Sequence, residues 1–143
     1  MWYTVPVLNV QATANGVFQT AYHVVWIPKY RRPILTGAVA IPLREILGGI
    51  APRNRWRVLA LEIQPDHLHL FLSVPPTIAV AAAIRQLKGA SSRYLRAMCP
   101  QLRRICRSGH LWAPSYYVGS AGNVSAQTLR RYIERAGHVS SRR

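Results

Sequence analysis

The chain has 143 residues and half of them are apolar, which predicts one globular domain over residues 1–143 and excludes a disordered chain. Its 19 basic residues face only 4 acidic ones, and the resulting formal charge of +15 makes nucleic acid the expected partner. No apolar run is long enough to cross a membrane. Cys99 and Cys106 do not make a disulfide framework, so we expect a cytoplasmic protein.

Arginine carries nearly all of this charge, because Lys29 and Lys88 are the only lysines. A guanidinium group pairs with phosphate oxygens in a planar fork and stacks on bases. An arginine-rich proteome would explain the preference for arginine over lysine, but it would not explain the scarcity of Asp and Glu. The composition therefore favours a phosphate-rich partner.

The first half of the chain predicts a strand, a helix and two further strands. Residues 1–16 are loosely patterned, and Asn15-Gly16 is a turn signal. The helix has an apolar stripe, and Pro42 inside it predicts that the regular part starts near that residue. The elements are expected over Phe18–Ile27, Thr36–Asn54, Arg55–Ile63 and His67–Val74.

The second half predicts a long helix, a strand and a final helix. Pro75-Pro76 breaks the chain, and Thr77 is a suitable N-cap for the long helix. Residues 99–115 are basic and irregular, and residues 138–143 are expected to be loosely ordered like residues 1–16. The elements are expected over Ile78–Met98, Trp112–Gly119 and from Ser125 to about Gly137.

The order of the first six elements matches the split βαβ arrangement of an α+β fold. This is the ferredoxin-like or RRM-like architecture, an antiparallel sheet with helices on one face. The final helix is extra to this pattern. If it covers part of the other face of the sheet, it comes near His67 and His69.

Polar and apolar residues alternate in the strand after Gln64-Pro65-Asp66. His67, His69 and Phe71 point to one side of this strand, and the leucines between them point to the other. Two imidazoles two residues apart, with Cα atoms roughly 6–7 Å apart, can converge on one metal ion. Two surface histidines without a metal would give the same pattern.

A basic loop that contains an aromatic residue follows the first strand after Pro28. Such a loop is either a solvated turn or a set of contacts to phosphates and bases. Two basic residues of the long helix complete the predicted DNA-binding set. The whole set is Lys29, Tyr30, Arg31, Arg32, Lys88 and Arg93.

Five stretches of the chain, from about residue 20 to residue 135, match one family in its order. They are Tyr22–Trp26 with Lys29–Arg31, Pro65–Leu70, Leu87–Arg93, Leu111–Trp112 with Pro114–Tyr116, and Tyr132–Glu134. A lone His-X-His pair is a weak signal, but the ordered set is specific. In these residues the chain resembles the single-tyrosine HUH transposases, the TnpA type of single-strand insertion sequences.

The resemblance implies a DNA transposase that binds hairpins at insertion-sequence ends and cleaves and rejoins single-stranded DNA. It implies that Tyr132 attacks a phosphodiester and forms a 5′-phosphotyrosine intermediate, while His67 and His69 hold a divalent metal ion. Family usage suggests Mg²⁺ or Mn²⁺, whereas two imidazoles suit manganese or zinc better than magnesium. The resemblance also implies a homodimer in which the tyrosine helix can complete the active site of the partner subunit.

The chain departs from the family where a third metal ligand is expected. The family usually has Gln four residues after the tyrosine, and this chain has Ala136, which cannot ligate a metal. His138 substitutes for it only if the chain bends back. Asp66 either supports His67 from behind or is a plain turn residue.

Two other functions remain open from the sequence. One is a catalytically inactive protein of the same fold that binds single-stranded DNA hairpins, and Ala136 is the residue that raises it. The other is an RRM-like RNA-binding protein. The second is weaker, because the strands lack an RNP aromatic pattern.

Ala136 generates a testable prediction. Ala136→Gln places an amide carbonyl one helical turn from Tyr132, so we expect tighter metal binding and cleavage at a lower ion concentration. The measurement is the cleavage rate titrated against magnesium and manganese for both proteins. Identical titrations with both proteins active would mean that another group, with His138 first, already supplies the ligand. Hairpin binding without cleavage by either protein would favour the inactive binder.

Overall fold

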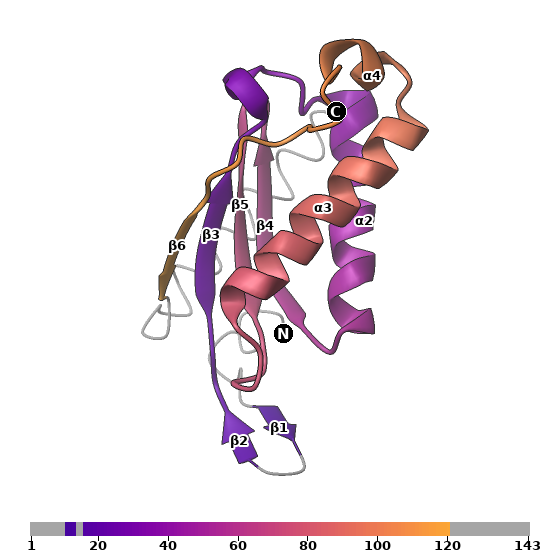
Figure 1. Cartoon of the computed structure of the whole chain (residues 1–143). Helices are drawn as coiled ribbons and strands as arrows, with labels where there is room; N and C mark the ends of the chain where they lie inside the picture. Colours follow the sequence, from indigo (N-terminus) through magenta and orange to yellow (C-terminus); the bar gives the residue numbers. More distant parts are fainter. Residues whose placement is uncertain (1–10, 14–15, 121–143) are drawn as a thin grey trace.

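A four-stranded antiparallel sheet is the centre of the computed structural model, which describes residues 11–13 and 16–120 (Figure 1). The strand order is β4-β5-β3-β6, and every neighbouring pair is antiparallel. β5 therefore lies between β3 and β4, as in the split βαβ arrangement. The strands are β3 (Tyr22–Trp26), β4 (Arg57–Gln64), β5 (His67–Ser73) and β6 (Tyr117–Ser120).

Two long helices cover one face of this sheet (Figure 1). α2 (Gly37–Arg53) joins β3 to β4, and α3 (Val80–Met98) leads from β5 through the short α4 (Gln101–Ile105) towards β6. This confirms the predicted α+β fold with an antiparallel sheet. The final helix expected to contain Tyr132 lies outside the described residues. Within residues 11–13 and 16–120, no helix has the length and apolar character needed to cross a membrane.

The core lies between the sheet and the two helices. Leu68, Leu70 and Leu72 of β5 have no solvent exposure, and they belong to one cluster with residues of both helices. This confirms that the leucines of β5 form the core face of the strand. The cluster also includes Val24, Trp26, Leu43, Leu47, Ile84, Leu87 and Leu95.

The prediction of one strand over Phe18–Ile27 is wrong. Gly16–Phe18 forms β2, which pairs with β1 (Gln11–Thr13) in a separate two-stranded sheet, and β3 begins only at Tyr22. The reason is Thr20, whose Oγ1 donates to the Val74 carbonyl (2.8 Å) and accepts from the Val74 amide (3.2 Å). The Thr20 side chain thus forms hydrogen bonds with the amide and the carbonyl of Val74, at the position where the β3–β5 ladder would have continued.

The prediction of a fourth strand from Trp112 is also wrong, because β6 starts at Tyr117. Trp112 makes only an isolated bridge with Pro28. Pro114 has no amide hydrogen to offer a ladder. Residues 99–115, expected to be irregular, include the short helix α4.

Helix α2 starts at Gly37, five residues before the expected start near Pro42. Pro42 lacks the amide hydrogen that would bond the Ala38 carbonyl one turn earlier. The Cys99 thiol donates to that carbonyl instead, with a sulfur–oxygen distance of 3.6 Å. A tertiary contact therefore satisfies the acceptor that the proline leaves unused, and the helix continues through it.

Candidate active site

His67 and His69 lie side by side on β5, on the face of the sheet opposite the helices. Their side chains alternate with the buried leucines, so the burial of Leu68 and Leu70 fixes the direction of both histidines. The two ring centroids are 5.0 Å apart and the rings are nearly perpendicular, with an interplanar angle of 80°. The structure thus brings together the two predicted metal ligands.

Asp66 connects His67 to the basic loop. Nδ1 of His67 donates to Oδ1 of Asp66 (2.7 Å), and Nε of Arg31 donates to Oδ2 (3.0 Å). The hydrogen bond from His67, assisted by Arg31, lowers the pKa of Asp66, so this carboxylate is ionised and accepts both bonds. Neutral His67 then has its proton on Nδ1 and its lone pair on Nε2. This geometry favours the interpretation of Asp66 as a support for His67 over that of a plain turn residue.

His23 is a third histidine on the same face, and sequence reasoning missed it as a site residue. Its Nε2 lies 2.9 Å from Nδ1 of His69, and its ring stacks on Phe71 with centroids 4.8 Å apart. Burial lowers the pKa of His23, which favours the neutral ring. The available signal was the alternation in β3: Val24 and Trp26 belong to the core, so His23 must lie on the other face.

Tyr117 of β6 adds a phenol to this face. Its ring meets His23 edge-on, with centroids 5.7 Å apart, and 57% of the residue is exposed. The Tyr117 side chain lies over Gly119, where a Cβ atom would overlap its hydroxyl group and come within 3.0 Å of Cζ. Glycine at this position therefore permits the conformation of Tyr117.

The two histidines of β5 fit a divalent metal ion as two of its ligands. Each has a hydrogen-bond partner at Nδ1, and this is how metal-binding histidines are usually oriented, with Nε2 directed to the metal. Among residues 11–13 and 16–120, no group of three His, Cys, Asp or Glu side chains could hold a metal. Tyr132, Ala136 and His138 lie outside the described residues, so their predicted roles stay predictions.

The basic loop forms a short 3₁₀ helix, η1 (Lys29–Arg31), next to the histidine strand. Tyr30 is 76% exposed, and Lys29 and Arg32 lie 5.5 and 5.7 Å from the centroid of its ring. Both Tyr30 and Arg31 have positive φ angles, 63° and 52°, which non-glycine residues seldom adopt. The loop therefore presents an aromatic ring with flanking cations, while Arg31 connects it to Asp66.

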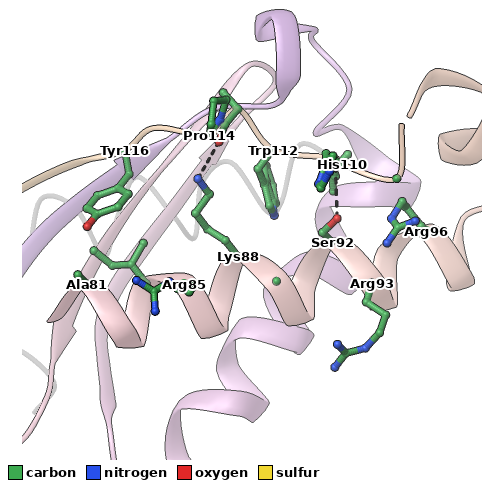
Figure 2. A pocket seen from close by; sticks show the side chains of 15 residues that line it. Ala81, Arg85, Lys88, Ser92, Arg93, Arg96, His110, Trp112, Pro114 and Tyr116 are labelled. Carbon is green, nitrogen blue, oxygen red and sulfur yellow. Dashed lines mark hydrogen bonds between the residues drawn. The ribbon is translucent and has the colours of Figure 1, made fainter. Parts of the chain in front are cut away.

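A cavity of about 620 Å³ lies between α3 and residues 109–116, on the helix side of the sheet (Figure 2). Arg96 and His110 lie close together at one end, and Tyr116 lies at the other. Arg93 points away from residues 109–116 and stacks on Tyr94, 5.2 Å from the ring centroid. The basic residues that line the cavity are Arg85, Lys88, Arg93, Arg96 and His110.

Lys88 links the two walls of this cavity, helix α3 and residues 109–116, by hydrogen bonds. Its Nζ donates to the carbonyls of Ala113 (2.7 Å) and Ser115 (3.2 Å), and burial lowers its pKa. The predicted DNA contact at Lys88 is therefore a side chain that already holds two backbone carbonyls.

Two of the sequence stretches that carry the family resemblance, Leu87–Arg93 and Leu111–Trp112, contact each other at this wall of the cavity. Nε1 of Trp112 donates to Oγ of Ser91 (3.0 Å), and the Leu111 amide donates to Oγ of Ser92 (3.3 Å). The Ala113 amide donates to the Ile27 carbonyl at the end of β3. The polar residues of α3 thus position the segment that leads into β6.

Comparison with known proteins agrees with this arrangement. The family described as "Transposase IS200 like" matches residues 16–136. This chain belongs to that family. It is 37% identical over 134 residues to the ISDra2 transposase TnpA of Deinococcus radiodurans, covering 94% of this chain and 96% of that protein. It is 33% identical over 124 residues to the IS200 transposase of Salmonella typhimurium, covering 87% and 81%.

Solved structures of transposases share the fold of this IS200-like transposase. A crystal structure of a candidate transposase from Deinococcus radiodurans R1 has a TM-score of 0.73 and 34% identity, covering 88% of this chain and 97% of that one. A REP-associated tyrosine transposase bound to a REP hairpin has a TM-score of 0.57 and 13% identity, covering 88% and 69%. The second likeness concerns the fold alone.

Lys88 of this IS200-like transposase gives a prediction that needs no DNA. Lys88→Met leaves the carbonyls of Ala113 and Ser115 without their charged donor, so we expect a loss of about 1–2 kcal/mol in unfolding free energy. Urea unfolding of the free protein measures it. Arg85→Met, at an exposed position one turn earlier on α3, is the matched control and should unfold like the wild type. An unchanged Lys88→Met protein would contradict the anchoring role.

Proposed function

We propose that this IS200-like transposase binds DNA hairpins at insertion-sequence ends and cleaves and rejoins single-stranded DNA through a 5′-phosphotyrosine at Tyr132. In this proposal a divalent ion, Mg²⁺ or Mn²⁺, binds His67 and His69. The observation that carries it is the pair of imidazoles on one sheet face, each with a partner at Nδ1. Family membership supports the transposase activity itself.

The proposed chemistry is a phosphoryl transfer from DNA to a phenol and back. The Tyr132 oxygen bonds to phosphorus, the bond to the 3′ oxygen breaks, the phenol loses its proton and the 3′ oxygen gains one. An ion on the two histidines would supply positive charge beside the phosphate. The phenol, with an ordinary pKa of about 10, needs such help at neutral pH. The phosphotyrosine conserves the bond energy, so rejoining needs no ATP.

The chain's own residues would prepare this reaction. Asp66 holds the Nδ1 proton of His67, and Arg31 fixes the Asp66 carboxylate from the loop side. Tyr30 is exposed and has Lys29 and Arg32 near its ring, so it suits stacking on an unpaired base near the histidines. A chain of hydrogen bonds thus runs from Arg31 of the loop through Asp66 to His67.

The basic cavity on the helix side is the proposed contact for the hairpin. The arginines of α3 that line it, Arg85, Arg93 and Arg96, supply positive charge for phosphates, distant in the fold from the face with the histidines. A protein of the same fold has been solved with a REP hairpin bound. We extend the proposal to a cytoplasmic homodimer in which Tyr132 of one protomer can serve the histidines of the other, as the family resemblance suggests.

One specific residue favours a second candidate function. Ala136 replaces the glutamine that the family usually has, so an inactive protein that binds hairpins without cutting them is the alternative. Such a protein would keep the basic cavity and the loop, and it would not need the histidine pair. Cleavage separates the two candidates.

The nucleophile is tested by Tyr132→Phe, which removes one hydroxyl group. We expect the variant to keep hairpin binding and to lose the covalent protein–DNA adduct formed with hairpin-flanked single strands, as seen on a denaturing gel. Tyr30→Phe, which keeps the exposed ring of the loop, is the matched control and should still form the adduct. An adduct in Tyr132→Phe would move the nucleophile elsewhere, to Tyr117 on the histidine face or to Tyr116.

The charge argument is tested by salt. Arginine contacts to phosphates release counterions, so hairpin affinity should fall on the order of a hundredfold or more between low and moderate salt. Measuring affinity over a salt series gives the slope of log affinity against log salt concentration. A flat response would remove the polyanion argument drawn from the +15 charge.

A further inference from the structure

We propose that His23 is a positioning residue that holds His69 in the tautomer with its proton on Nδ1. This tautomer leaves the lone pair of His69 on Nε2, the nitrogen through which it would bind the metal of the proposed function. The inference therefore rests on that function for its purpose, but the tautomer itself is a property of the metal-free protein. Neither the match of the family nor the predicted ligand pair assigns a role to His23.

The contact between these two histidines joins neighbouring antiparallel strands. In the β3–β5 ladder His23 lies opposite Phe71, and Val25 lies opposite His69, so the two histidines are diagonal neighbours on one face. Nε2 of His23 and Nδ1 of His69 are 2.9 Å apart, a normal distance for a nitrogen–nitrogen hydrogen bond. The diagonal arrangement suits two long planar side chains.

The ring of His23 is held in place from several directions. It lies nearly parallel to the Phe71 ring, at an interplanar angle of 7°, and the edge of Tyr117 meets it from β6. Phe71 is almost completely buried, and the backbone on either side of His23 is held in the β3 ladder. A ring packed in this way presents its Nε2 to His69 in a defined direction.

Two neutral imidazoles can share one hydrogen bond in only two ways. If His23 donates from Nε2, then Nδ1 of His69 is the acceptor, and the proton of neutral His69 sits on Nε2, where it blocks a metal bond. If His69 donates from Nδ1, its Nε2 keeps the lone pair. Only the second arrangement fits His69 as a metal ligand, and it requires His23 to carry its own proton on Nδ1.

The two histidines of β5 would then reach the same tautomer through different partners. His67 donates to the Asp66 carboxylate, which is negatively charged, whereas His69 donates to a neutral ring. A neutral acceptor orients the ligand without adding negative charge beside a phosphate. Loss of a partner of this kind typically weakens metal binding about 10- to 100-fold.

The test compares four proteins by two measurements. Nitrogen-15 NMR of the histidine rings in the metal-free protein reads the tautomer of His69, and titration with Mn²⁺ alone reads metal affinity. His23→Phe keeps a ring against Phe71 but removes the acceptor, and His23→Gln keeps an acceptor at about the same reach. His110→Phe is the matched control, since it removes a histidine on the helix side of the sheet.

We expect wild type and His110→Phe to show His69 protonated on Nδ1, with equal manganese affinity. His23→Phe should show mixed tautomers and an affinity about 10- to 100-fold weaker. His23→Gln should restore much of both. A wild-type His69 protonated on Nε2, or a His23→Phe protein with unchanged tautomer and affinity, would overturn the inference.

The failure of the proposed function would look different. If His69 changes tautomer in His23→Phe as expected, while no protein binds manganese or forms an adduct, then His23 positions His69 and the metal-dependent cleavage is wrong. The tautomer of His69 can be measured in the wild-type protein, so the inference stays testable even if His23→Phe does not fold.

Discussion

Burial of three leucines on β5 fixes the register on which the rest of the candidate site depends. Leu68, Leu70 and Leu72 pack against α2 and α3 with no exposure to solvent. A slip of one residue would turn the two histidines into this core, where neutral imidazoles would lose their partners and the leucines would meet water. The chemistry of the strand and the stability of the fold therefore share one constraint.

The same alternation explains what the sequence could reveal. It predicts the two faces of β5, and the order of the elements predicts the sheet with helices on one side. It also places His23 on the site face, because His23 alternates with the core residues Val24 and Trp26, but it does not give the start of β3 at Tyr22. That start depends on the hydroxyl group of Thr20, which bonds residue 74, and no local pattern announces a partner 54 residues away.

The late start of β6 has a similar origin. The carbonyls of residues 113 and 115 accept hydrogen bonds from Lys88, and the Trp112 indole donates to Ser91. Side chains of α3 therefore hold this segment, which has only isolated backbone bonds to the residues after β3 and no continuous ladder. Propensity favours a strand there, and tertiary hydrogen bonds override it. The sequence did indicate that these stretches belong together, because both match the same family, but it could not say that they touch.

Gly119 shows how a site can depend on an atom that is absent. Its missing side chain makes room for a neighbouring tyrosine, and that tyrosine lies against the histidine that faces His69. Replacing Gly119 with valine or threonine would raise the β-propensity of the edge strand β6. The new Cβ atom would displace the ring of Tyr117 from its position. Optimising one strand for its own stability would thus disturb the contacts around His23 and His69, although neither histidine had been changed.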